Sequence, residues 1–376
     1  MEKKRIFLSS PTMHGEEQEF IKEAFDTNWI APLGANVNGL EKDMEHYTGC
    51  GFAAALVSGT SAIHLALKLS GVTRDDIVFC SDLTFSATAN PIAYEGAKAV
   101  YIDSEEETWN MDPLALKKAF EKYPNAKAVI CVNLYGTPAK LTELRDICKE
   151  HGAAFIEDAA ESLGARYKGQ HTGTFGDIGI YSFNGNKIIT TSGGGMLVSA
   201  DEAKVKKARF LSTQAREPAR HYEHKEIGYN YRMSNIVAGI GRGQMLHLDE
   251  HVKKKAEIYQ TYRKGFEDIP EICMNPYLED SAPNFWLSCM TIDPGSGVTP
   301  AMVMDALDQE NIESRPIWKP MHLQPVFRDN DFISVTDGVS IGEKLFDCGL
   351  CLPSDIKNTK EDMELIIKTI RGLFGK

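Results

Sequence analysis

The chain has 376 residues, of which 43% are hydrophobic and 25% charged, and its formal net charge is −12. This composition excludes an intrinsically disordered chain and is typical of a globular protein. The acidic balance, without a long basic run, argues against nucleic acid as a main partner, because phosphate binding needs a clustered positive face. No apolar run approaches the roughly 20 residues of a membrane span. The apolar residues 6–8 are also too few for a signal-peptide core, so we expect a cytoplasmic protein without a membrane partner.

Eight cysteines are scattered along the chain. They are too few and too dispersed for the disulfide framework of a small secreted protein. Cys348 and Cys351 form one CxxC pair, but no second pair or histidine motif completes a zinc site. We therefore expect reduced, packed thiols and no metal.

Short apolar runs alternate with amphipathic stretches through the first two thirds of the chain. The expected elements, in chain order, are a strand at 99–103, a helix at 112–122, a strand at 126–132, a helix at 140–151, and strands at 153–158, 177–182 and 196–199. Short β-rich runs separated by helices of this length indicate βαβ units. They predict an α/β fold with a large, mostly parallel sheet that helices cover on both faces.

The C-terminal third has a different pattern. A helical pattern runs from residue 234 to about 266, and beyond Pro270 prolines separate shorter elements. Two amphipathic helices are expected at 338–348 and 359–374. We therefore predict a large domain at residues 1–245 and a smaller α+β domain at residues 246–376, joined by the long helix.

Three segments carry residues suited to chemistry. Asp158 closes the strand at 153–158, and functional residues gather at the carboxyl ends of parallel strands. Lys187 stands alone among Asn, Gly, Ile and Thr residues in the loop after the strand at 177–182, where partial desolvation would make it nucleophilic. Residues 58–61 place Gly and hydroxyl side chains before a helix, an arrangement that suits phosphate. Taken singly, each segment has an ordinary alternative: helix capping by Asp158, helix capping by a Ser or Thr of residues 58–61, and a surface role for Lys187.

The combination is more specific than its parts. A phosphate-binding helix start, an acidic residue at a strand end and a lysine 29 positions later (187 − 158) match the needs of pyridoxal phosphate. This cofactor requires a phosphate cup, a carboxylate that keeps its ring nitrogen protonated, and a lysine that binds its aldehyde.

These residues lie in segments that resemble a known family. Residues 31–34, 58–62, 157–161, 181–187, 228–235 and 315–322 are similar, in this order, to motifs of the DegT/DnrJ/EryC1/StrS sugar aminotransferases. These enzymes belong to the fold-type I pyridoxal phosphate enzymes. The resemblance covers essentially the whole chain and implies a transaminase, since Lys187 is retained where dehydrating relatives carry His.

The resemblance also implies roles for the matching residues. Lys187 would bind the cofactor and carry a proton, and Asp158 would pair with the ring nitrogen. The other cofactor contacts would come from Thr60, Ser61 and Ser182 at the phosphate, Phe85 on the ring face, and Glu161 beside the ring hydroxyl, where many relatives carry Gln or His. Asn235 would reach the phosphate from a partner subunit, which implies a homodimer with shared active sites.

The implied substrates are L-glutamate as amino donor and a nucleotide-linked ketosugar as acceptor. Candidate sugar-nucleotide residues form two groups, Arg315, Trp318 and His322 in one segment and His221, Tyr222 and Arg232 in another. Core packing for Trp318 and a structural role for His322 are the alternatives.

The finest resemblance is to the bacillosamine branch of glycan biosynthesis and protein glycosylation, on residues 184–192 and 212–217. It implies amination of UDP-2-acetamido-4-keto-2,6-dideoxyglucose to UDP-4-amino-4,6-dideoxy-GlcNAc, with release of 2-oxoglutarate. Related enzymes for dTDP-, GDP- or other UDP-ketosugars, or with the opposite stereochemistry at the aminated carbon, share most of these motifs.

Two other classes of protein are weighed. A nicotinamide-dependent dehydrogenase is suggested by the glycines at 239–243, but these lie in a helical pattern where a dinucleotide fingerprint would follow a strand. A non-catalytic sensor with the same fold is disfavoured because Lys187, Asp158 and the phosphate cup are all retained.

Overall fold

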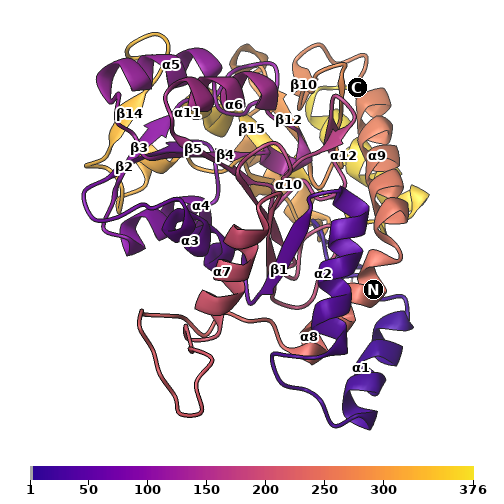
Figure 1. The fold of residues 1–376 in the computed structure, drawn as a ribbon. Coiled ribbons are helices and arrows are strands. Elements are labelled where there is room, and N and C mark those ends of the chain that lie inside the picture. Colours follow the sequence, from indigo (N-terminus) through magenta and orange to yellow (C-terminus); the bar gives the residue numbers. More distant parts are fainter. Residues whose placement is uncertain (1–2) are drawn as a thin grey trace.

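The computed structural model describes residues 3–376 and is built around an eight-stranded sheet (Figure 1). The strands, in spatial order, are β1 (Phe52–Leu56), β9 (Gly195–Ser199), β8 (Ile178–Ser182), β5 (Ala154–Asp158), β4 (Ala128–Val132), β2 (Ile77–Ser81), β3 (Lys98–Ile102) and β14 (Asp331–Ile333). The pairs from β8 to β14 are parallel, and only β9 pairs antiparallel, with β8 and β1. The predicted α/β fold with a mostly parallel sheet is confirmed.

Alternate side chains of the central strands pack into two hydrophobic cores, one on each face of the large sheet, because successive residues of a strand point to opposite faces. On β2, Val78 and Cys80 pack with α3 (Gly59–Leu69), α4 (Ser86–Tyr94) and α7 (Glu202–Ser212). Phe79, between them, packs on the other face. That face is covered by α5 (Pro113–Lys122) and α6 (Leu141–Glu150), which lie above the sheet in Figure 1.

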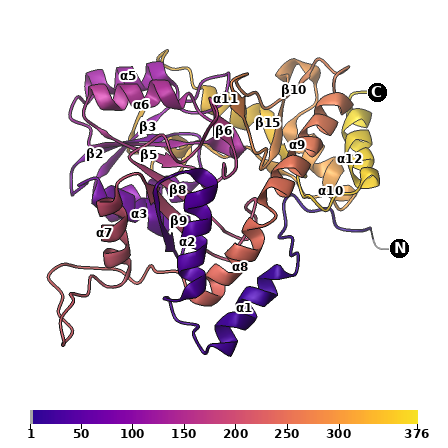
Figure 2. The same cartoon turned by 45° about the vertical axis from the view of Figure 1, so that its right-hand side comes forward.

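The C-terminal part forms a second, four-stranded sheet. Its order is β10 (Ile272–Met274), β12 (Ser288–Ile292), β15 (Gly349–Leu352) and β13 (Arg315–Pro316). One core joins this sheet to α9 (Leu248–Gly265), α10 (Pro300–Gln309) and α12 (Lys360–Leu373), and Figure 2 shows these helices gathered beside it. The remaining helix of this part is α11 (Ile341–Cys348). The C-terminal part also contributes β14 to the large sheet, so the division near residue 245 stays a proposal.

The expected single helix from 234 to about 266 is wrong. The chain forms α8 (Asn235–Met245) and α9, and leaves helical geometry at His247. The physical reason is that the two halves bury different faces against different partners. Helix α8 packs on α1 (Glu16–Asp26) and α2 (Ala35–Thr48), so closely that a Cβ at Gly243 would lie 2.5 Å from the Glu17 nitrogen. Helix α9 packs on the small sheet instead.

A third, three-stranded sheet flanks the two main ones. It pairs β6 (Arg166–Tyr167) with β7 (Gln170–His171) and β11 (Ser281–Ala282). None of the helices in the described part of the chain could serve as a membrane span. All eight cysteines are free thiols.

Candidate active site

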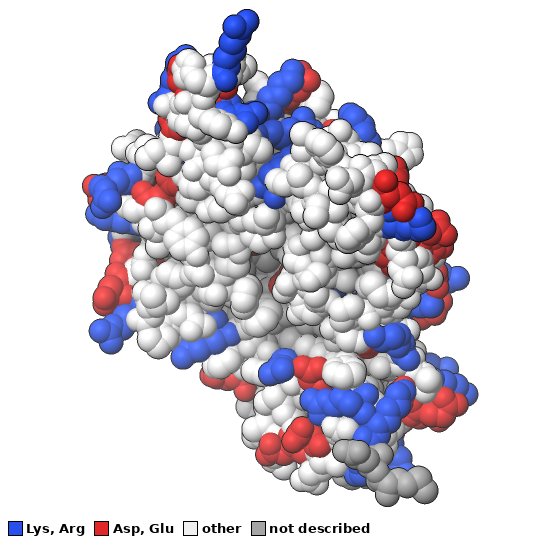
Figure 3. All heavy atoms as spheres, turned by 90° about the horizontal axis from the view of Figure 1, so that it is seen from below, with Lys and Arg blue, Asp and Glu red and all other residues white. Residues whose placement is uncertain are grey.

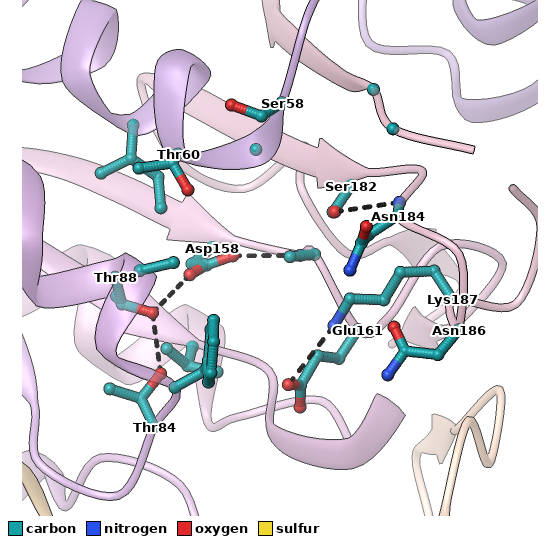
Figure 4. Close-up of a pocket in the computed structure, with 18 of the residues that line it drawn as sticks. Ser58, Thr60, Thr84, Thr88, Asp158, Glu161, Ser182, Asn184, Asn186 and Lys187 are labelled. Atoms are coloured by element: carbon teal, nitrogen blue, oxygen red, sulfur yellow. Dashed lines mark hydrogen bonds and ion pairs between the residues drawn. The ribbon is translucent and has the colours of Figure 1, made fainter. Parts of the chain in front are cut away.

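A cavity of about 330 Å³ lies where β2, β5 and β8 end. Asp158 is the last residue of β5, Ser182 is the last residue of β8, and Thr84 and Phe85 follow β2. Lys187, in the loop between β8 and β9, extends its amine into the same space (Figure 4). The sheet therefore brings together residues that are far apart in the sequence, because parallel strands end at one edge.

The Asp158 carboxylate is buried and held by two donors. Thr88 Oγ1 donates to Asp158 Oδ2 at 2.7 Å, and the Ala160 N–H donates to Oδ1 at 3.1 Å. Burial raises the pKa of Asp158, while Thr88, the Ala160 N–H and the charge of Lys187 act in the opposite direction. A carboxylate offers about four acceptor sites, so this one keeps capacity for a further donor from the cavity.

The amine of Lys187 lies between an acid and an aromatic ring. Its Nζ is 3.6 Å from Glu161 Oε1 and 3.9 Å from the ring centroid of Trp286. Glu161 Oε2 accepts the Tyr135 N–H at 2.7 Å. Burial raises the pKa of Glu161, although the charge of Lys187 lowers it in part. Glu161 is therefore protonated more readily here than in water. Protonation would remove the repulsion between this side chain and the ionised ring hydroxyl of pyridoxal phosphate.

Helix α3 begins at the cavity with small residues. Ser58 is its N-cap, and its Oγ accepts the Ser61 N–H at 3.0 Å. A Cβ at Gly59 would lie 3.3 Å from Ser182 Cβ, so glycine lets the helix start close to the end of β8. Thr60 and Ser182 line the cavity. The first turn of a helix has backbone N–H groups without intrahelical partners, and this end therefore suits a phosphate group.

These groups fit pyridoxal phosphate. A lysine amine, a buried carboxylate and a helix start with hydroxyl groups surround one cavity, and each has the chemistry that a different part of the cofactor requires. Phe85 also lines the cavity and is half exposed, with its ring centroid 5.2 Å from that of Trp318. Trp318 Nε1 is buried without a hydrogen-bond partner among the described residues.

Residues 3–376 contain no group of His, Cys, Asp and Glu side chains placed to bind a metal.

Ser61 and Asn235, two of the expected cofactor residues, make other contacts within this chain. The Ser61 hydroxyl lies 2.8 Å from Ser58 Oγ, and Ser61 does not line the cavity. Asn235 accepts the Asn36 N–H at 2.9 Å through its Oδ1 and donates to Trp29 O at 2.7 Å through its Nδ2. It therefore caps the start of α2 within its own chain and keeps one amide N–H without a hydrogen-bond partner in residues 3–376, so its expected contact with the cofactor of a partner subunit stays a prediction.

Of the six expected substrate residues, only Trp318 lines this cavity, and four line neither it nor the larger cavity beside it. Arg232 is buried, pairs with Glu41 and donates to Ala55 O at 2.9 Å. His221 and Tyr222 lie on the loop between β-bridge residues 213 and 230, which projects from the body in Figures 1 and 2. Tyr222 is 79% exposed. The physical reason is that Glu41 holds Arg232 in a buried ion pair, while His221 and Tyr222 belong to the projecting loop.

His322 is the fourth of these residues, and its contacts lie outside both cavities. Its Nδ1 lies 2.6 Å from Asp82 Oδ2, and its Nε2 lies 2.8 Å from Glu343 Oε1. Its ring stacks on Phe332, with centroids 4.0 Å apart. Both ring nitrogens are therefore engaged away from the cavity. Burial acts to lower the pKa of His322, but the two carboxylates outweigh burial and raise it.

A second cavity of about 610 Å³ adjoins the first. The two share a wall of Thr84, Phe85, Asn186, Trp286 and Trp318. Arg315 lines the second cavity together with Lys319. Arg315 is exposed, and its only anionic contact in residues 3–376 is Glu313, at 2.9 Å. Two cations beside aromatic rings suit a ligand that combines a phosphate with a planar base.

The sequence analysis missed several residues of the site. Thr84 and Thr88 follow the end of β2 and position Asp158, and their position after a strand was a usable signal. Tyr135 links the two cavities. Its backbone N–H donates to Glu161, and its hydroxyl accepts the backbone N–H of Trp318 at 2.9 Å. Trp286 lies two residues before β12 of the small sheet, and no local pattern marks it.

The fold and the site together define a pyridoxal phosphate-dependent enzyme of fold type I. Solved structures agree, since the aminotransferase TlmJ from Streptoalloteichus hindustanus superposes with a TM-score of 0.89 at 25% identity over 98% of both chains. The sequence pattern of the DegT/DnrJ/EryC1/StrS aminotransferase family matches residues 11–371, and the chain belongs to this family. It is a pyridoxal phosphate-dependent sugar aminotransferase.

Three relatives are similar to this chain in sequence. EpsN of Bacillus subtilis, provisionally named a pyridoxal phosphate-dependent aminotransferase, is 51% identical over 99% of this chain and 96% of its own. The GDP-perosamine synthase of Caulobacter vibrioides is 34% identical over 97% of both chains. The UDP-4-amino-4,6-dideoxy-N-acetyl-beta-L-altrosamine transaminase of Campylobacter jejuni is 35% identical over 63% of both chains.

The family membership also decides between the classes weighed from the sequence. The glycines at 239–243 lie inside α8 and pack against α1 and α2. They do not form the strand–turn–helix of a dinucleotide-binding fingerprint, so the dehydrogenase alternative has no structural support.

Proposed function

We propose that this enzyme transfers the amino group of L-glutamate to carbon 4 of UDP-2-acetamido-4-keto-2,6-dideoxyglucose. The products would be UDP-4-amino-4,6-dideoxy-GlcNAc, for bacillosamine and glycan biosynthesis, and 2-oxoglutarate. The Campylobacter relative, named for a UDP-linked 4-amino-4,6-dideoxy sugar, supports a UDP-linked acceptor. The second candidate is a GDP-linked ketosugar, which the GDP-perosamine synthase of Caulobacter favours through its longer match.

The observation that carries the proposal is the pair of adjoining cavities. The smaller one contains Lys187, Asp158 and Glu161, and the larger one contains Arg315 and Lys319. A nucleotide-linked ketosugar has both an electrophilic carbonyl and a diphosphate. The carbonyl would lie near Lys187 while the two cations bind the diphosphate beyond the shared wall.

In the mechanism that we infer, the residues of the chain bind, hold charge and move protons. Bound pyridoxal phosphate supplies an electron sink that allows a C–H bond beside the amino group to break. Thr60, Ser182 and the first turn of α3 would bind its phosphate. The negative charge of Asp158, which Thr88 holds in place, would keep the ring nitrogen protonated.

Lys187 is the base and acid of the reaction in this proposal. Its Nζ would take a proton from the donor carbon and return it at the other end of the conjugated system, on the same face. Glu161 would face the ring hydroxyl, and its raised pKa allows it to hold a proton there. Phe85 and Trp318 would exclude water at the wall between the cavities.

We propose that the enzyme acts as a homodimer. Figure 3 shows a face on which charged side chains lie mainly along the rim, around a hollowed, largely uncharged centre. Exposed apolar side chains also gather in residues 25–33 and on the projecting loop, where Ile227 is 84% exposed. Large exposed apolar surfaces mark interaction sites. Size-exclusion chromatography with light scattering should give twice the 41.7 kDa of the chain, and a stable monomer would contradict the dimer.

The near-visible absorption spectrum of the purified protein tests the reaction. We expect a cofactor band that L-glutamate bleaches and that UDP-2-acetamido-4-keto-2,6-dideoxyglucose restores. GDP- and dTDP-linked 4-keto-6-deoxy sugars at equal concentration are the matched comparison. Restoration only by the GDP-linked sugar would replace the proposed acceptor, and mass spectrometry with NMR of the product would give the stereochemistry at carbon 4.

A further inference from the structure

Helix α9 carries two buried polar side chains directed toward the loop that holds Lys187. His251 and Lys255 are four residues apart, so they lie on one face of the helix. His251 Nδ1 lies 2.7 Å from Ile188 O, and Lys255 Nζ lies 2.9 Å from Trp286 O. Helix α9 therefore contacts Ile188, the residue after Lys187, and Trp286, whose indole lies beside Lys187.

Lys255 is an unusual residue to bury. It is 3% exposed, and no carboxylate within residues 3–376 forms an ion pair with its amine. Burying an unpaired ammonium is costly, and burial lowers the pKa of Lys255 to about 7, with the charge of Asp355 opposing. A neutral amine has two N–H donors, and two acceptors are present, Trp286 O and Ser9 Oγ at 3.1 Å. The anchoring bonds therefore survive loss of the ammonium proton.

The indole of Trp286 connects this anchor to the active site. Its Nε1 donates to Asn186 O at 2.7 Å, and Ser9 Oγ donates to the same oxygen at 3.1 Å. The carbonyl before Lys187 is thus held by two donors. The face of the same indole lies 3.9 Å from Lys187 Nζ, a distance at which an ammonium is attracted by an aromatic ring.

We propose that Trp286, anchored by Lys255, is a positioning residue that holds the Lys187 amine in the cavity whenever this amine is not bonded to the cofactor. A catalytic lysine must leave and rejoin the cofactor in each cycle, and a flexible side chain would otherwise disperse over many rotamers. The indole face on one side and Glu161 on the other keep Nζ close to the reacting atoms. This inference deepens the proposed function, since it concerns the residue that moves the proton there.

The test uses the full-length protein freed of cofactor, and compares wild type with Trp286→Leu, Trp286→Phe and Lys255→Met. Labelling of Lys187 by acetic anhydride, quantified by peptide mass spectrometry, should be about three- to tenfold faster in Trp286→Leu, which loses the ring that holds the amine. Recovery of the near-visible band on addition of pyridoxal phosphate should slow by a similar factor. Trp286→Phe, which keeps a ring face, should stay within about twofold of wild type.

Tyr259→Phe is the matched control. It removes one buried hydrogen bond, to Asn275 O, on the same helix as Lys255 without reaching the Lys187 loop. It should lower the melting temperature and leave both rates unchanged. Lys255→Met, which keeps the length of the side chain, should fall between Trp286→Phe and Trp286→Leu.

Equal labelling and recovery rates in wild type, Trp286→Leu and Lys255→Met would overturn the positioning role. If Trp286→Leu does not fold, Lys255→Met decides, since wild-type rates in that variant also overturn the inference. Failure of the proposed function is a separate result. It would appear as a wild-type band that glutamate bleaches and the UDP-linked ketosugar does not restore, which leaves both rates measurable.

Discussion

The two adjoining cavities differ in how their residues are held. In the smaller cavity, Asp158 and Ser182 are the last residues of central strands, and Asp158 is fixed by Thr88. In the larger cavity, Arg315 lies on the edge strand of the small sheet, is exposed and contacts only Glu313 among the described anionic side chains. In our proposal, the carboxylate and the phosphate-binding hydroxyl that every substrate would need thus lie at rigid strand ends. Arg315, which would help to select the substrate, lies on an edge, where sequence change disturbs the fold least.

The largest expected effect is on turnover, when Lys187 of the smaller cavity is replaced. Lys187→Ala should lower kcat by about 10²–10⁴-fold, because proton transfer by a positioned side chain contributes this much. Release of 2-oxoglutarate in a coupled assay measures the loss. Lys360→Ala removes an exposed lysine of α12, with 84% of its side chain accessible, and should change nothing. Turnover above one tenth of wild type in Lys187→Ala would mean that another group moves the proton.

Loss of charge at the end of β5 should come next. Asp158→Asn keeps the shape and the contact with Thr88 but removes the negative charge, and should lower kcat by about 10²-fold. Thr88→Val keeps the charge and removes the hydroxyl that holds it, so it should cost roughly tenfold, since a hydrogen bond to a charged group contributes about 1.5–3 kcal/mol. If kcat falls by the same factor in both variants, Asp158 contributes through its position and not through its charge.

A substitution in the larger cavity should weaken binding of the sugar nucleotide and leave the rate of the glutamate half-reaction unchanged. Arg315→Ala should raise the KM of the sugar nucleotide by about tenfold, which corresponds to one charge-assisted contact. The rate at which glutamate bleaches the cofactor band should stay the same, because this half-reaction uses only the smaller cavity. Arg328→Ala is the control, since Arg328 is exposed and lies 3.8 Å from Asp329. A slower glutamate half-reaction in Arg315→Ala would show that the two cavities are not independent.

The smallest effect should be on stability, at His322 beside the larger cavity. Its pKa is raised above the ordinary value of 6.5 by Asp82 and Glu343, so the folded state binds the proton more tightly than the unfolded state. The stabilisation is fully present below pH 6.5 and is lost as the pH rises through the folded-state pKa. His322→Gln should therefore lower the free energy of unfolding by roughly 1–2 kcal/mol at pH 6 and by less at pH 9.

Urea unfolding at both pH values measures this difference. His46→Gln, on the exposed side of α2, is the control and should show no such change between the two pH values. A constant difference across the pH range in His322→Gln would mean that the ring is held by packing on Phe332 and not by its charge.

The sequence by itself determined the α/β fold with a mostly parallel sheet, Asp158 at the end of one strand and Lys187 in the loop after another, but not β1, β2 and β14 or the order of the strands. The reason is that strand periodicity and chain order are local properties, and parallel strands must end at one edge. Only the tertiary structure decided which neighbours the other side chains have. Arg232 pairs with Glu41, 191 residues away, and Asn235 caps α2, 199 residues from Asn36. Long-range pairs of this kind leave no periodic signal, and neither does Trp286, which reaches Lys187 from the segment before β12.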